Sequence, residues 1–180
     1  MRTVGIDYSL SSPCVCIHEG VGEFNISNCS FYYLTSTKKY EGVNGILNGQ
    51  LHLDYTSDEQ RYHQITTWVL TLLKENDSIC IEGYSMASTG RVFNIAENAG
   101  LLKHYLWKQD YKFSVVPPTV IKKFATGKGN ANKEKLQESF VEETGVNIKY
   151  ILNMTEKQWN PSSDIIDAYY LCKYGAKNNV

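Results

Sequence analysis

The sequence predicts an α/β fold, a five-stranded mixed sheet flanked by helices, and two observations carry this prediction. Segments with strand character come first, and apolar runs of strand length then alternate with segments of helical periodicity. At 180 residues with 42% hydrophobic content, the chain can bury one core without disulfide support. We therefore expect residues 1–180 to form a single domain.

Three strands are predicted first, at residues 3–10, 14–18 and 24–34. In the first of them apolar residues alternate with Gly5 and Asp7, so these two residues share one face. The short connections between the three strands favour an antiparallel meander. Residues 35–55 are polar and glycine-rich, and their Asn-Gly pairs at 44–45 and 48–49 indicate turns in an excursion that could contain a hairpin.

Capping residues and periodicity predict the remaining elements. Ser57 and Gln60 form a capping-box pattern that begins a helix, which ends at Asn76-Asp77. Asn160 is predicted as the N-cap of the last helix, with Pro161 at its first position. Two further strands are predicted at residues 78–83 and 112–116, and three further helices at residues 90–109, 119–126 and 132–144.

The charge is unevenly distributed. The net charge is −1, but residues 117–137 carry five lysines against one acid, a local balance of +4 that leaves −5 for the rest of the chain. A local basic patch can bind phosphates, because binding depends on the contacts made and not on total charge. We therefore consider that this segment, with Lys122, Lys123, Lys128 and Lys133, contacts DNA; the alternative is a solvated basic face.

The cysteine and hydropathy patterns indicate the cellular compartment in which the protein is expected. Five cysteines, an odd number without a CxxC pair, indicate neither a disulfide framework nor a zinc site. No apolar stretch approaches the roughly 20 residues of a membrane span, and no N-terminal signal is visible. We expect a soluble protein without a membrane partner, in the cytoplasm of a bacterial cell or a phage-infected host.

Four acidic residues are the clearest indication of chemistry: Asp7, Glu82, Asp164 and Asp167. Asp7 and Glu82 each end an apolar run, where an ionised carboxylate is costly to bury unless a cation compensates it. Asp164 and Asp167 are spaced i, i+3 and share a helix face. Such oxygen ligands suit Mg²⁺ or Mn²⁺. The alternatives are that Asp7 caps a turn and that the other pair only complements a helix dipole.

Several segments together resemble the RuvC family of Holliday junction resolvases, in the ribonuclease H-like superfamily. They are Gly5-Ile6-Asp7, Ile81-Glu82, Asp164-x-x-Asp167-Ala168, and the stretch KKFATGKGNANK at residues 122–133. The resemblance covers nearly the whole chain apart from residues 36–56. Tyr8-Ser9 replaces the usual Pro-Gly, and Ile165-Ile166 replaces small residues, which suggests a divergent, phage-type member.

The resemblance implies a ribonuclease H-like sheet in which the strands of Asp7 and Glu82 lie side by side. It implies that the four acids are catalytic and hold two Mg²⁺ or Mn²⁺ ions, and that Lys122 and Lys133 contact phosphates. The implied activity is metal-dependent resolution of four-way DNA junctions by paired nicks. Tyr84 and Met86, which follow Glu82, are placed where an apolar side chain could wedge into opened DNA.

Other functions remain open. A nuclease of the same fold could cut flaps or three-way junctions or act in genome packaging, because a fold does not fix a substrate. A DNA-binding protein that has lost catalysis is less favoured, because all four acids are present. Sugar kinases and actin-like ATPases begin with a similar Gly-Ile-Asp segment, but they need two such domains, which 180 residues cannot supply.

The predicted helix at residues 90–109 has apolar residues on two faces. One stripe can pack on the sheet and consists of Val92, Ile95, Ala99, Leu102 and Leu106. A second set is left over: Phe93, Leu101, Tyr105 and Trp107. An apolar surplus is typical of an interface, so we expect a homodimer through this helix. The alternative is that residues 36–56 cover the surplus.

Overall fold

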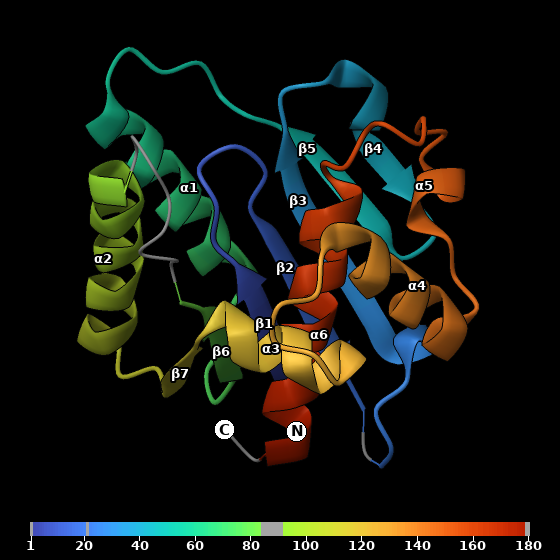
Figure 1. Cartoon of the computed structure of the whole chain (residues 1–180). Helices are drawn as coiled ribbons and strands as arrows, with labels where there is room; N and C mark the ends of the chain where they lie inside the picture. Colours follow the sequence, from blue (N-terminus) through green and yellow to red (C-terminus); the bar gives the residue numbers. More distant parts are fainter. Residues whose placement is uncertain (1, 21, 84–91, 179–180) are drawn as a thin grey trace.

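The computed structural model describes residues 2–20, 22–83 and 92–178. In these residues one mixed sheet of seven strands is flanked by helices (Figure 1). The strands lie in the order β4-β5-β3-β2-β1-β6-β7. Their bounds are Arg2–Asp7 (β1), Cys14–Glu19 (β2), Cys29–Thr35 (β3), Gly42–Asn44 (β4), Leu47–Leu51 (β5), Ser78–Glu82 (β6) and Phe113–Val116 (β7).

The five predicted strands form a continuous block at the centre and one side of this sheet. β1, β2 and β3 pair in antiparallel fashion, which confirms the meander. β6 runs parallel to β1, and β7 runs parallel to β6. The prediction of the mixed α/β class is therefore confirmed, although the third strand begins later than predicted because a 3-10 turn at Ile26–Asn28 precedes it.

The predicted number of strands was wrong, because the excursion extends the sheet. β4 and β5 form an antiparallel hairpin around Asn44-Gly45, and β5 pairs in parallel with β3. Gly45 has a φ of 59°, as such a turn requires. The turn predicted at Asn48-Gly49 is also wrong: these residues lie inside β5, where a Cβ on Gly49 would come within 2.0 Å of the Tyr40 carbonyl oxygen.

Helices cover the sheet on both faces. One face packs on α1 (Asp58–Leu72) and α2 (Val92–Lys108), and the other packs on α3 (Pro118–Thr126), α4 (Lys133–Thr144), α5 (Ile148–Ile151) and α6 (Ser162–Asn178). The Ser57 hydroxyl accepts from the Gln60 backbone N–H at 3.2 Å, which confirms the predicted start of α1. Within the described parts of the chain, no helix is long and apolar enough to cross a bilayer.

The alternation along β1 separates two cores. Val4 and Ile6 belong to the apolar cluster under α1 and α2, whereas Gly5 faces α6 on the opposite side of the sheet. The five cysteines are all free and buried.

The two apolar faces of α2 have different surroundings. Leu102 and Leu106 are completely buried against the sheet. Phe93 and Trp107, however, are 80% and 70% exposed. The alternative that residues 36–56 cover them is therefore wrong, and α2 presents large apolar side chains at the surface.

Candidate active site

Asp7 and Glu82 end two neighbouring parallel strands. In the register of β1 and β6, Ile6 lies opposite Ile81, so the next residue of each strand is an acid at the same carboxyl edge of the sheet. This edge is where open α/β sheets place their sites. Asp7 is buried, and Glu82 is partly exposed.

α6 brings two more acids to this edge. Gly5 lies two residues before Asp7 and faces the same side, and a Cβ on Gly5 would lie 2.2 Å from the Cys172 backbone nitrogen and 2.3 Å from the Ala168 carbonyl oxygen. Only glycine allows the helix to come so close. The first turns of α6 therefore lie beside the end of β1, where the negative charge of Asp164 raises the pKa of Asp7.

The environment of the four acids disfavours their charged forms. Burial raises the pKa of Asp164 to about 6, of Glu82 to about 7 and of Asp167 to about 8. Burial also raises the pKa of Asp7 well above its usual value, and the negative charges of the other three acids raise it further. Each of the four carboxyl groups thus affects the ionisation of at least one of the others, and we call the four residues the acid cluster.

Two predicted lysines act on the acid cluster from different helices. Lys122 in α3 and Lys133 at the start of α4 both lower the pKa of Asp167, although burial and the neighbouring acids outweigh them. The Lys133 ammonium donates to the Ser163 hydroxyl at 3.3 Å, directly before Asp164. The two lysines therefore provide positive charge at the rim of the acid cluster, where a phosphate can bind.

Of the other four residues predicted to contact DNA, the structure describes two. Lys123 is exposed on α3, and Lys128 is exposed on the turn that follows Gly127. Gly127 ends α3 in the left-handed conformation, with a φ of 79°. Tyr84 and Met86 lie outside the described residues.

A cleft of about 460 Å³ opens beside the acid cluster. Asp7, Glu82, Asp167 and Lys122 line it, together with Arg61 from α1. Arg61 was not predicted, because in the sequence it is only one charged residue on an amphipathic helix. Its guanidinium donates to the Leu10 carbonyl oxygen at 2.6 Å, and this contact holds the loop that follows β1.

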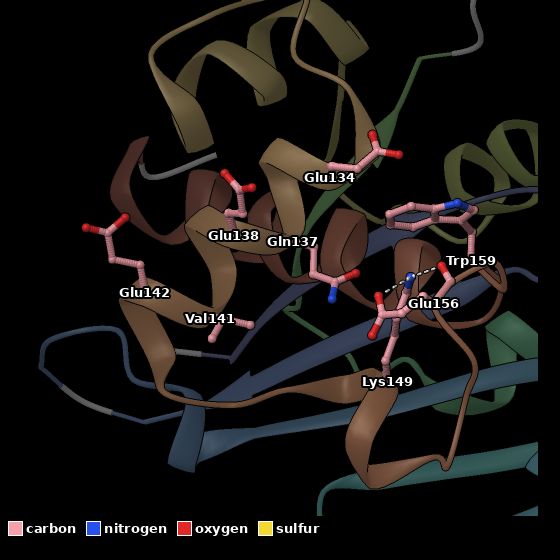
Figure 2. Close-up of a pocket in the computed structure, with 8 residues that line it drawn as sticks. All are labelled: Glu134, Gln137, Glu138, Val141, Glu142, Lys149, Glu156 and Trp159. Atoms are coloured by element: carbon pink, nitrogen blue, oxygen red, sulfur yellow. Dashed lines mark hydrogen bonds and ion pairs between the residues drawn. The ribbon is translucent and has the colours of Figure 1, made fainter.

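A second cavity, of about 620 Å³, is lined by none of the four acids of the acid cluster (Figure 2). Its walls carry Glu134, Glu138 and Glu142 along α4, with Glu156 opposite. This concentration of negative charge repels a polyanion. The smaller cleft beside Asp7 and Lys122 is therefore the better candidate for a DNA-processing site.

The donor set of the acid cluster fits Mg²⁺ or Mn²⁺, because it consists of carboxylate oxygens alone. Across residues 2–20, 22–83 and 92–178, no three His, Cys, Asp or Glu side chains already stand around one point as ligands. Burial and the neighbouring negative charges favour the protonated forms of Asp7, Glu82 and Asp167. Ion binding would displace the protons that these carboxyl groups hold.

The stability of the metal-free protein should fall as the pH rises. The folded state holds protons on the acid cluster up to pH about 6 to 8, whereas unfolded Asp and Glu release them near pH 4. The stabilisation is therefore complete below about pH 4 and is lost as the pH rises through the folded values. Thermal unfolding in a chelator should show this decrease, and Mg²⁺ should raise the melting temperature most at pH 8. A melting temperature that does not respond to Mg²⁺ would contradict the cation site.

Comparisons with known proteins agree with this architecture. No protein-family model matches the sequence, and no curated protein matches it. Thermus thermophilus RuvC is similar in structure, with 15% sequence identity over 99% of this chain and 97% of that chain and a TM-score of 0.61. The same protein in complex with a Holliday junction substrate gives 14% identity, coverage of 99% and 94%, and a TM-score of 0.63. The fowlpox virus Holliday junction resolvase has 13% identity over the full length of both chains and a TM-score of 0.49.

The likeness to the two Thermus structures extends over nearly all of this chain and nearly all of theirs. It therefore includes both the central strands that end in Asp7 and Glu82 and the C-terminal helix of Asp164 and Asp167. The ribonuclease H-like architecture predicted from the sequence is confirmed, and this chain has the fold of RuvC.

Proposed function

We propose that this chain is a metal-dependent endonuclease that resolves four-way DNA junctions by paired nicks. The acid cluster carries this proposal, because four carboxyl groups from β1, β6 and α6 meet at the carboxyl edge of the sheet with Lys122 and Lys133 beside them. Such an arrangement is suited to phosphodiester hydrolysis and has no evident structural purpose, since it raises the cost of folding.

The chain's residues have two roles in this proposal. Asp7, Glu82, Asp164 and Asp167 would hold two Mg²⁺ or Mn²⁺ ions, which supply activation of water and stabilisation of the leaving oxygen. Lys122 and Lys133 would bind the phosphates next to the cut, and the exposed Lys123 and Lys128 would extend the contact along the strand.

The substrate class is supported by the Thermus RuvC structure that contains a Holliday junction. The deciding experiment incubates the protein with labelled four-way, three-way, flap and linear DNA in Mg²⁺ and maps the cuts. Symmetric nicks on the four-way junction alone are expected. Preferential cutting of flaps or three-way junctions would favour the alternative nucleases, and binding without any cut would favour an inactive DNA-binding protein.

Lys133→Ala should weaken junction binding in a salt-dependent way. Loss of one phosphate contact reduces the slope of log affinity against log salt by about one unit. The control is Lys74→Ala, because Lys74 pairs with Glu19 at the opposite edge of the sheet and should leave the slope unchanged. If cleavage fell while affinity and slope stayed the same, Lys133 would act on the transition state instead.

The working unit in this proposal is a homodimer formed through α2. The exposed Phe93 and Trp107 supply apolar surface, and a two-fold dimer would present two acid clusters to a nearly two-fold symmetric junction. Leu101→Glu should convert the dimer to a monomer and abolish paired nicking, measured by light scattering at micromolar concentration and by cut mapping. Val43→Glu is the control, since Val43 is an exposed apolar residue on β4. A wild-type protein that stays monomeric on junction DNA would rule the dimer out.

A further inference from the structure

The Ser12 side chain joins the loop after β1 to the acid cluster. Its hydroxyl donates to Oδ2 of Asp164 at 2.6 Å and lies 2.6 Å from Nδ2 of Asn160. Ser12 and Asp164 are both buried, so these contacts form away from bulk water. Two segments far apart in the sequence, the loop after β1 and residues 160–164, therefore meet at one hydroxyl group.

The direction of these hydrogen bonds follows from the donor types. The amide Nδ2 of Asn160 can only donate, so it donates to Oγ of Ser12. The hydroxyl proton of Ser12 is then directed to the carboxylate of Asp164. Ser163 donates to Oδ1 of Asn160 at 3.4 Å, which is consistent with this orientation of the amide.

The backbone around both ends of this chain of hydrogen bonds is also held. On one side, the Ser12 backbone N–H donates to the Ser9 hydroxyl at 3.1 Å, and His52 contacts the Ser11 carbonyl oxygen at 2.9 Å. The loop that contains Ser12 is therefore held by a contact within the loop and by His52 from the segment of residues 35–55.

On the other side, the buried Lys149 fixes the segment before α6 (Figure 2). Its ammonium donates to the Glu156 carbonyl oxygen at 2.8 Å and lies 3.6 Å from the centre of the Trp159 ring. Trp159 directly precedes Asn160. The position of Asn160 is thus set by packed neighbours even though its own side chain is exposed.

We propose that Ser12 and Asn160 are positioning residues that hold the Asp164 carboxylate in the orientation needed for ion binding. This inference rests on the proposed function. Engagement of Oδ2 by Ser12 restrains rotation of the carboxylate, and the Asn160 amide keeps the Ser12 hydroxyl from turning away. Removal of a group that orients a metal ligand in this way typically changes metal affinity or activity by about 10- to 100-fold.

The packing role of Ser12 is separable from its hydrogen bond. Ser12→Ala keeps the volume almost unchanged and removes the hydroxyl, whereas Ser12→Thr keeps the hydroxyl. A matched control is Ser162→Ala, because the buried Ser162 hydroxyl has no hydrogen-bond partner among the described residues although it lies two residues from Asp164. A general sensitivity of this region to substitution would affect all three variants.

The experiment measures Mn²⁺ affinity by calorimetry and single-turnover junction cleavage on the full chain. Ser12→Ala should lower Mn²⁺ affinity by at least about tenfold and lower the cleavage rate at fixed Mn²⁺, with junction affinity in chelator unchanged. Ser12→Thr should recover most of the loss, and Ser162→Ala should resemble the wild type. Because Asn160 acts through Ser12, Asn160→Ala should have a smaller effect and none in the Ser12→Ala background.

Wild-type affinity and cleavage in Ser12→Ala would overturn the inference while leaving the proposed nuclease intact. Additive effects of the two substitutions would also overturn it, because the residues would then act independently. If Ser12→Ala did not fold, Asn160→Ala would decide alone, since its side chain is exposed. A wild-type protein that neither binds Mn²⁺ nor cleaves would instead contradict the proposed function itself.

Discussion

Asp7→Asn is expected to abolish junction cleavage and to leave junction binding in place. The substitution preserves the shape of the side chain and removes one negative charge from the centre of the acid cluster, where the other three acids all act on Asp7. We expect the single-turnover rate in Mg²⁺ to fall by at least about 100-fold, the scale found when one preorganised electrostatic group is removed. Glu82→Gln should behave similarly.

The same substitution should stabilise the metal-free protein. Burial raises the pKa of Asp7, so a neutral amide at this position avoids the cost of a buried charge at pH 7. Loss of activity with a raised melting temperature distinguishes a functional acid from a structural one. Asp110→Asn is the control, because Asp110 lies in a turn before β7 with a φ of 58° that asparagine also tolerates. Full cleavage by Asp7→Asn would remove Asp7 from the proposed ligands.

The sequence predicts the central sheet well because its strands have strong local signals. β1 and β6 are apolar runs that end in an acid, and the alternation along β1 correctly separates Gly5 from Val4 and Ile6. The possible hairpin in residues 35–55 is confirmed as β4 and β5, but its addition to the sheet was not predicted because its residues are mostly polar or glycine. β5 becomes a strand through pairing with β3, and β4 through pairing with β5. Local periodicity does not contain the tertiary pairing of β5 with β3.

The acids of the candidate site were predictable because buried carboxylates break the apolar pattern of their elements. The residues around them were not. Asn160 has the sequence signature of an N-cap, but α6 begins at Ser162 and the Asn160 amide contacts Ser12 instead. Ser12 contacts Asp164, and Arg61 contacts the Leu10 carbonyl oxygen. In both pairs the two residues are more than fifty positions apart in the sequence. No local pattern carries that information.

Gly5→Ala is expected to have the largest effect on stability. The new methyl carbon would lie 2.2 Å from the Cys172 nitrogen and 2.3 Å from the Ala168 carbonyl oxygen, and both are backbone atoms that side-chain rotation cannot move. Relief requires α6 to shift away from β1. We expect a loss of about 3 kcal/mol or more in the free energy of unfolding, at the upper end for overpacked cores.

The matched control is Gly100→Ala, in the exposed middle of α2, where a new Cβ would meet nothing within 4 Å. There the helix propensity of alanine should stabilise the protein by about 0.5 to 1 kcal/mol. Urea unfolding of both variants measures the two opposite effects. Because α6 carries Asp164 and Asp167, any folded Gly5→Ala protein should also bind Mn²⁺ more weakly than the wild type. Unchanged stability with unchanged Mn²⁺ affinity would contradict the close approach of α6 to β1 as the origin of the acid cluster.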